Sequence, residues 1–198
     1  MSTDSEIIRR SIGEPEAFSG LFDRHARAVG AFAYRRVGDA AGEDVLSESF
    51  LVAFQRRGSF DLQRESALPW LLGITSMVAR RHRVAEARQW RAFEASAARG
   101  VHAADAGLDD LHDRLDAQAA MPVLARRIAA LTARDRETLL LYAWGELTYE
   151  EIADALGVPV GTVRSRLNRV RRRLDPSRRR RSIENQEGDE NGTVAAHA

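Results

Sequence analysis

The segment from Thr148 to Leu174 contains the start and stop signals of two short helices. Thr148 stands three residues before Glu151, which is the spacing of a capping box, where two residues satisfy each other's backbone amides as a helix begins. Gly157 stands where a helix commonly ends in a left-handed residue, and Pro159 cannot continue a helix. Two short helices joined by a glycine-containing turn are typical of a helix-turn-helix.

The second of these helices is expected at 161–174, with a basic face opposite an apolar face of Val163, Leu167, Val170 and Leu174. It contains six arginines and no acidic residue, whereas a merely solvated helix usually mixes the two signs. Arginine and asparagine in the major groove of DNA make paired hydrogen bonds with guanine and adenine, worth about 1–3 kcal/mol each. We therefore predict a DNA-binding face made of Thr162, Arg164, Ser165, Asn168, Arg169 and Arg172. Phosphate contacts are expected from Arg166, Arg171 and Arg173.

Helical periodicity dominates the rest of the chain, and strand signals are nearly absent. Helices are expected at 4–11, 15–37, 41–56, 67–90, 108–130, 133–144 and 149–156. Small residues fill 92–107, which we expect to be a flexible linker, and the polar tail at 176–198 is expected to be disordered. The expected fold class is all-α, with two small helical domains, at 1–91 and 108–175.

The composition excludes several kinds of site. The chain has no cysteine, which excludes a disulfide framework and a thiolate metal site and suits a reducing cytoplasm. No stretch reaches the length of a membrane span and the first residues lack the apolar core of a secretory signal, so we expect a cytoplasmic protein without membrane insertion. The net charge is only +1, but basic and acidic residues gather in separate segments, which indicates different faces for different partners.

An acidic stretch in the N-terminal half predicts a protein-docking surface. Asp44, Ser47, Glu48 and Leu51 lie within one arc of about 100° at helical spacing. An acidic arc that includes an exposed leucine is suited to contact with another protein. The alternative is a solvated helix face without a partner. The packing side of the same helix is expected to consist of Val45, Ser49, Val52 and Ala53.

The helix expected at 67–90 combines an aromatic residue with a basic end. Trp70 lies in its first turn, and further along stand the arginines Arg80, Arg81 and Arg83. Aromatic side chains beside a basic cluster suit single-stranded DNA, which is held by base stacking and phosphate contacts. A lone tryptophan is more often part of a hydrophobic core, so both roles remain open for Trp70.

These segments, in this order, resemble the extracytoplasmic-function sigma factors, the smallest members of the sigma-70 family of RNA polymerase initiation factors. The resemblance covers the chain from about Glu16 to Leu174. The stretch AGEDVLSESFLVAF is similar to the domain-two helix that docks on the clamp helices of the polymerase β′ subunit. Residues 68–83 are similar to the segment that melts and recognises the −10 promoter element. The stretch LTYEEIADALGVPVGTVRSRLNRVRRRL closely resembles the domain-four unit that recognises the −35 element.

The resemblance implies a sigma factor that binds core RNA polymerase and directs promoter-specific transcription initiation. Residues 1–91 would be domain 2 and residues 108–175 domain 4, with 92–107 between them and 176–198 as a tail. The expected partners are core RNA polymerase, through its β′ clamp helices and β subunit, promoter DNA and an anti-sigma factor. No cofactor, metal or catalytic residue is expected, because the polymerase supplies the chemistry.

The resemblance also assigns roles to individual residues. It places polymerase binding on Asp44, Ser47, Glu48 and Leu51. It places −10 recognition on Trp70, Ser76, Arg80, Arg81 and Arg83, and −35 recognition on the DNA-binding face of 161–174. The family often has glutamine at the position of Ser47 and asparagine at the position of Met77. Because Met77 differs from the family pattern, the base preference at the −10 element is not inferred from relatives.

Two other classes of function are compatible with parts of the sequence. A stand-alone helix-turn-helix regulator would use 131–174 to bind DNA and the N-terminal half to sense a ligand or dimerise. It would bind DNA without polymerase. An enzyme would need a catalytic constellation, and the chain has no nucleotide-binding glycine loop and no metal-spaced histidines. The five histidines are scattered, at His25, His82, His102, His112 and His197.

Overall fold

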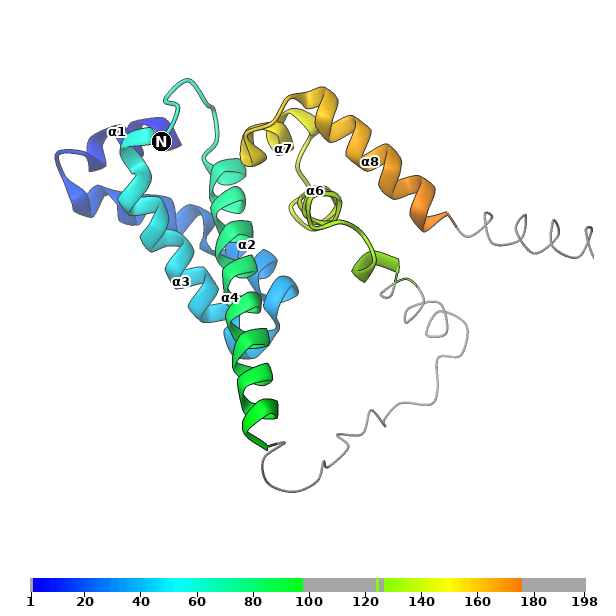
Figure 1. Ribbon diagram of the computed structural model, residues 1–198. Helices are drawn as coiled ribbons and strands as arrows, with labels where there is room; N and C mark the ends of the chain where they lie inside the picture. Colours follow the sequence, from blue (N-terminus) through cyan, green and yellow to red (C-terminus); the bar gives the residue numbers. More distant parts are fainter. Residues whose placement is uncertain (1, 98–123, 125–126, 176–198) are drawn as a thin grey trace, which may run out of the picture.

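The computed structural model describes residues 2–97, 124 and 127–175, and all regular structure within them is helical (Figure 1). The N-terminal half contains α1 (Asp4–Ser11), a 3-10 turn (Pro15–Phe18), α2 (Ser19–Val37), α3 (Asp39–Arg56), a second 3-10 turn (Arg57–Ser59) and α4 (Leu68–Ala97). The C-terminal part contains α6 (Ala133–Trp144), α7 (Tyr149–Leu156) and α8 (Val160–Leu174). The predicted all-α fold is confirmed.

The largest difference from the expected boundaries is the length of α4. It continues to Ala97, inside the segment 92–107 that we expected to be a linker. The reason is local, because the residues after Val84 are mostly good helix formers and the first glycine comes only at 100. The rest of that segment, the tail at 176–198 and most of the helix expected at 108–130 lie outside the described residues.

Helices α2 and α3 form an antiparallel pair whose close packing depends on one glycine. At one end the ring of Phe22 packs edge-on against Phe50, with centroids 4.8 Å apart. At the other end the ring of Tyr34 lies over Gly42, where an added Cβ would stand 2.7 Å from its Cγ. Between the two helices Gly38 turns the chain with a φ of 79°, a conformation that favours glycine.

A buried carboxylate fixes α1 to the rest of the N-terminal half. Asp4 is only 3% exposed, and it accepts hydrogen bonds from the backbone amide of Ala67 at 2.8 Å and from Arg24. Its other partner is Nε2 of His25, at 2.7 Å. Burial by itself raises the pKa of Asp4, but these hydrogen bonds outweigh it and hold the pKa below its ordinary value. One side chain therefore joins α1, α2 and the approach to α4.

Helix α4 lies at the centre of the structure, with α2 and α3 on one side and α7 against its N-terminal end (Figure 1). Leu71, Leu72 and Val78 of this helix are fully buried or nearly so. The same hydrophobic core continues into the C-terminal part, where Leu141 and Ile152 are also fully buried. A single apolar core therefore connects the two halves of the described chain.

Replacing Gly42 with alanine is expected to destabilise the N-terminal half by about 1–3 kcal/mol, the usual cost of overfilling a packed contact. The cause is the ring of Tyr34, which leaves no room for a methyl group. Urea unfolding of Gly42→Ala measures the change. Gly20→Ala is the matched control, because its Cβ meets Ile7 at an ordinary 3.5 Å. If Gly42→Ala costs as much in a Tyr34→Ala background, the clash is not the cause.

Candidate nucleic-acid interface

The start and end of α7 have the geometry that the sequence predicts. The hydroxyl of Thr148 accepts a hydrogen bond from the amide of Glu151 at 3.2 Å, and the carboxylate of Glu151 accepts one from the amide of Thr148 at 2.8 Å. Gly157 ends the helix in the left-handed region, with a φ of 61°. The chain then turns at Pro159 and enters α8. The helix-turn-helix geometry is therefore present.

Helix α8 separates its apolar and polar sides as expected. Val163, Leu167 and Val170 are buried, and α8 packs against α6 and α7. On its outer side Arg164, Ser165, Asn168, Arg169 and Arg172 are exposed, and Thr162 is half-buried. Figure 1 shows α8 pointing away from the N-terminal half, so this side of the helix is open to a large partner.

Arg169 is held by a buried carboxylate that the sequence did not indicate. Its Nε and Nη2 donate to the two oxygens of Asp135 on α6, each at 3.0 Å. Asp135 is 1% exposed, and its backbone amide donates a hydrogen bond to the hydroxyl of Thr132, the N-cap of α6. Burial raises the pKa of Asp135, but the hydrogen bonds from Arg169 and Thr132 prevail and lower it. The pair fixes where the guanidinium of Arg169 points.

The flanking arginines of α8 differ in whether their side chains form hydrogen bonds within the C-terminal part. Arg171 donates a hydrogen bond to the hydroxyl of Tyr149 at 2.8 Å, and the ring of Tyr149 packs edge-on against Tyr142. Arg166 is half-buried, with Nη1 3.4 Å from the hydroxyl of Thr138. Arg166 and Arg171 thus contact their own helical unit, although Arg171 is exposed, as is Arg173.

The acidic arc of α3 is exposed along its whole length. Asp44, Ser47 and Glu48 face solvent, and Leu51 is 56% exposed although it is a large apolar residue. The opposite side packs as expected, because Val45, Ser49 and Ala53 are fully buried and Val52 is half-buried. Glu48 accepts a hydrogen bond from Arg81 of α4 at 2.6 Å, so the acidic arc touches the arginines near the middle of that helix.

The residues expected to contact single-stranded DNA do not form one exposed surface. Arg80, Arg81 and Arg83 are exposed. Trp70 is half-buried, and its ring lies 5.2 Å from that of Phe60. Ser76 is 3% exposed, and its hydroxyl has no hydrogen-bond partner among the described residues. The structure thus separates an accessible basic segment in the middle of α4 from a covered polar and aromatic part.

The described part of the chain contains neither a metal-binding cluster nor a membrane-spanning helix. No group of three or more histidine and acidic side chains there is arranged to hold a metal ion. None of the described helices combines the length and the apolar character that crossing a membrane requires.

Comparisons with known proteins agree with the order of these elements. The family description "Sigma-70 region 2" matches residues 21–89, and "Sigma-70, region 4" matches residues 108–174. The RNA polymerase sigma-H factor of Pseudomonas aeruginosa is 31% identical over 188 residues, covering 87% of this chain and 92% of that protein. The ECF RNA polymerase sigma-E factor of Escherichia coli is 28% identical over 179 residues, covering 87% of this chain and 93% of that protein.

A solved structure has a similar arrangement of helices. It is that of CnrH in complex with the cytosolic domain of CnrY, with a TM-score of 0.56 and 22% sequence identity. The match covers 87% of this chain and 95% of that one. At this identity the similarity concerns the fold alone.

The pair of Asp135 and Arg169 is expected to make the stability of the C-terminal part depend on pH. A carboxyl whose pKa is lower in the folded state stabilises that state fully above its unfolded pKa of about 3.9, and the contribution disappears as pH falls towards the folded pKa. Asp135→Asn should therefore unfold more easily than the unmodified protein at pH 7, with the difference shrinking below about pH 4. Urea unfolding from pH 7 to pH 3 measures this. A difference that is constant with pH would contradict the assignment.

Proposed function

The chain belongs to the extracytoplasmic-function group of the sigma-70 family, and we propose that its two helical units divide promoter recognition between them. As a member of this family it is an RNA polymerase sigma factor that directs transcription initiation. The unit at 1–91 would bind polymerase and the −10 element, and the unit at 108–175 would bind the −35 element, with 92–107 between them. The stand-alone regulator considered from the sequence is set aside, because both sigma regions occur in one chain in the expected order.

Recognition of the −35 element is assigned to the outer side of α8. The observation that carries this assignment is the exposure of Arg164, Ser165 and Asn168 on a helix whose opposite side is buried. A helix of this kind enters the major groove, where arginine and asparagine distinguish guanine and adenine. Arg169 would act from a fixed position because of its pair with Asp135. Thr162 and Arg172 complete the proposed contact surface.

Polymerase binding is assigned to the acidic arc of α3. Exposure of Leu51 beside Asp44 and Glu48 supports this, because a large apolar side chain with acidic neighbours suits a partly basic protein surface. Ser47 lies between them on the same arc. The β′ clamp helices of core RNA polymerase are the proposed partner, and the β subunit is a second proposed contact.

Binding and melting of the −10 element are assigned to α4. The exposed Arg80, Arg81 and Arg83 would contact phosphates, and Trp70 would support an unstacked base. Ser76 belongs to the same proposed surface and lies one residue before Met77. Because Met77 stands where the family often has asparagine, the −10 base preference of this chain is not inferred from its relatives. Unstacking a base costs a few kcal/mol, which the polymerase-bound protein recovers through these contacts.

The wider setting follows from the family. We propose that the chain catalyses no reaction itself, requires no cofactor and works in the cytoplasm, where polymerase and promoter DNA are found. We also propose an anti-sigma factor as a regulatory partner that covers one or more of these surfaces.

The proposed function is tested by pull-down with core RNA polymerase followed by run-off transcription. The full chain should be retained by core enzyme and should start transcripts at a subset of promoters selected from genomic fragments. A chain that binds duplex DNA alone and is never retained by core enzyme would refute the proposal.

Substitutions should separate the two activities. Arg164→Ala or Asn168→Ala is expected to weaken binding to −35 duplex DNA about 5- to 150-fold, the cost of one paired base contact, and to leave core binding unchanged. Arg27→Ala, an exposed arginine on α2, is the control. Fluorescence anisotropy with holoenzyme measures both affinities.

Glu48→Arg is expected to have the opposite effect, with core binding weakened at least about tenfold and −35 recognition retained. Glu43→Arg is the matched control, because Glu43 is exposed on the same helix but lies outside the acidic arc. If both charge reversals weaken core binding equally, overall charge and not the arc determines docking.

A further inference from the structure

A cavity of about 630 Å³ lies between α4 and the C-terminal part, and arginines from four helices line it. They are Arg56 at the end of α3, Arg80 of α4, Arg134 of α6 and Arg166 of α8. Glu137 is the one acidic residue among the described residues of the wall, and its carboxylate accepts hydrogen bonds from Arg36 at 3.0 and 3.2 Å. The four arginines therefore line the cavity without a carboxylate that balances their charge.

Three of these arginines have unpaired guanidinium groups. The side chains of Arg56, Arg80 and Arg134 are exposed and form no ion pair or hydrogen bond with another described residue. The fourth, Arg166, is half-buried, and its partner is the neutral hydroxyl of Thr138, 3.4 Å from Nη1. A cluster of like charges favours binding of an ion of the opposite sign. Guanidinium groups suit phosphate in particular, because two of their N–H groups can donate to it in parallel.

A buried hydroxyl in the wall of the same cavity also has no partner. Ser76 is 3% exposed, and its Oγ forms no hydrogen bond with the rest of the described chain. Thr75 beside it and Ser49 of α3 are also buried, but each donates to the backbone carbonyl four residues earlier. A buried polar atom without a partner is unfavourable, so the hydroxyl of Ser76 is a donor that a ligand in the cavity would satisfy.

The rest of the wall is largely apolar. Trp70, Ile74 and Met77 of α4 belong to it, together with Leu156 and Val158 of the C-terminal part. Tryptophan binds a flat base by stacking, and methionine makes favourable contacts with aromatic rings. A cavity that is apolar in one part and strongly basic in another suits a ligand that combines a flat ring system with several negative charges.

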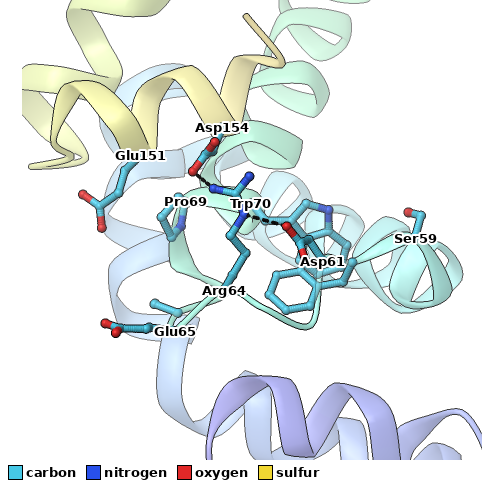
Figure 2. A pocket seen from close by; sticks show the side chains of 10 residues that line it. Ser59, Asp61, Arg64, Glu65, Pro69, Trp70, Glu151 and Asp154 are labelled. Carbon is cyan, nitrogen blue, oxygen red and sulfur yellow. Dashed lines mark hydrogen bonds and ion pairs between the residues drawn. The ribbon is translucent and has the colours of Figure 1, made fainter. Parts of the chain in front are cut away.

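A second cavity that also includes Trp70 has the opposite electrostatic character. Its volume is about 360 Å³. Among its described wall residues are four acidic residues and one arginine, namely Asp61, Glu65, Glu151, Asp154 and Arg64. Figure 2 shows Arg64 between Asp61 and Asp154, and it is paired with both. This cavity therefore does not suit an anion, and the unpaired arginines distinguish the larger cavity from it.

We propose that the cavity of about 630 Å³ is a binding site for a nucleoside polyphosphate, with the phosphates among the four arginines and the base against the apolar wall. The volume is in the range of small-molecule sites and excludes a DNA duplex. The site is separate from the surfaces assigned to polymerase and to the −35 element. Trp70, Ser76 and Arg80 also belong to the proposed −10 surface, whereas Arg134 and Arg166 do not, so substitutions distinguish the two.

Isothermal titration calorimetry of the full chain with ATP tests the site. The titration is done at low ionic strength and without divalent cations, because salt screens the attraction between phosphates and arginines. We expect saturable binding of one ATP per chain. The absence of binding, or binding that does not saturate, would overturn the proposal.

Arg134→Ala should weaken ATP binding at least about tenfold, the loss expected for a hydrogen-bonded contact between charged groups. The side chain of Arg134 is exposed and unpaired, so its removal should leave the chain folded. Arg27→Ala is the matched control, because Arg27 is exposed on α2 and does not line the cavity. An equal loss in both variants would mean that net charge and not the cavity attracts ATP, and the site would be refuted.

Ser76→Ala provides a second variant with a different signature. Without ATP it should be no less stable than the unmodified protein in urea unfolding, because it removes an unpaired polar atom. Its affinity for ATP should fall about two- to tenfold, the loss of one neutral hydrogen bond. Lower stability with unchanged affinity would contradict the role of this hydroxyl in the site.

Inorganic tripolyphosphate shows whether the nucleoside contributes. It should bind at least about fivefold more weakly than ATP, because it has no base to stack on the apolar wall. Equal affinities would overturn the assignment to a nucleotide.

Binding at the outer side of α8 is recognised by Arg164→Ala. If this variant loses as much affinity for ATP as Arg134→Ala, the ligand binds the DNA-binding face and the cavity is refuted as its site. These measurements use neither polymerase nor promoter DNA, so failure of the proposed function is recognised separately.

Discussion

Helix α4 packs against two different partners, and the remaining elements are arranged around this constraint. Along its length α4 packs against α2 and α3, and near its N-terminal end α7 lies directly on its backbone. A helix covered in this way needs large apolar residues on one side and a small residue on the other. Leu71 and Val78 are fully buried large residues of this helix, Leu72 reaches Gly145 of the C-terminal part, and Gly73 is the small residue beneath α7. One continuous core results, although the sequence patterns are those of two units.

The sequence predicts the local structure well, because capping and periodicity involve neighbouring residues. The capping box of Thr148 and Glu151, the left-handed Gly157 and the buried side of α8 could all be inferred from spacing alone. The exposed sides of α3 and α8 follow from the same periodicity. The end of α4 is predicted several residues too early, because the small residues of 92–107 indicate a linker. Most of the residues at 92–97 favour a helix, and α4 continues through them.

Contacts between residues far apart in the sequence could not be predicted in this way. Asp135 is ordinary in its own helix, and only the packing of α6 against α8 brings it to Arg169. Ser76 likewise lines a cavity together with Glu137 and Ala155 of the C-terminal part, a neighbourhood that no local pattern specifies. The roles proposed for individual residues therefore rest on two kinds of information. One is the family's sequence pattern, and the other is the exposure of each side chain, which only the structure gives.

In the proposed complex of α8 with the −35 element, the pair of Arg169 with Asp135 would also affect how binding depends on ionic strength. A free arginine that binds a phosphate displaces a condensed counterion from DNA, and each such contact steepens the dependence of affinity on salt concentration. Arg169 already has a carboxylate beside it, so its net charge towards DNA is partly cancelled before binding. The number of arginines on α8 would thus overstate its sequence-independent affinity for DNA. More of the binding free energy of the proposed complex would then depend on directed hydrogen bonds, which distinguish one DNA sequence from another.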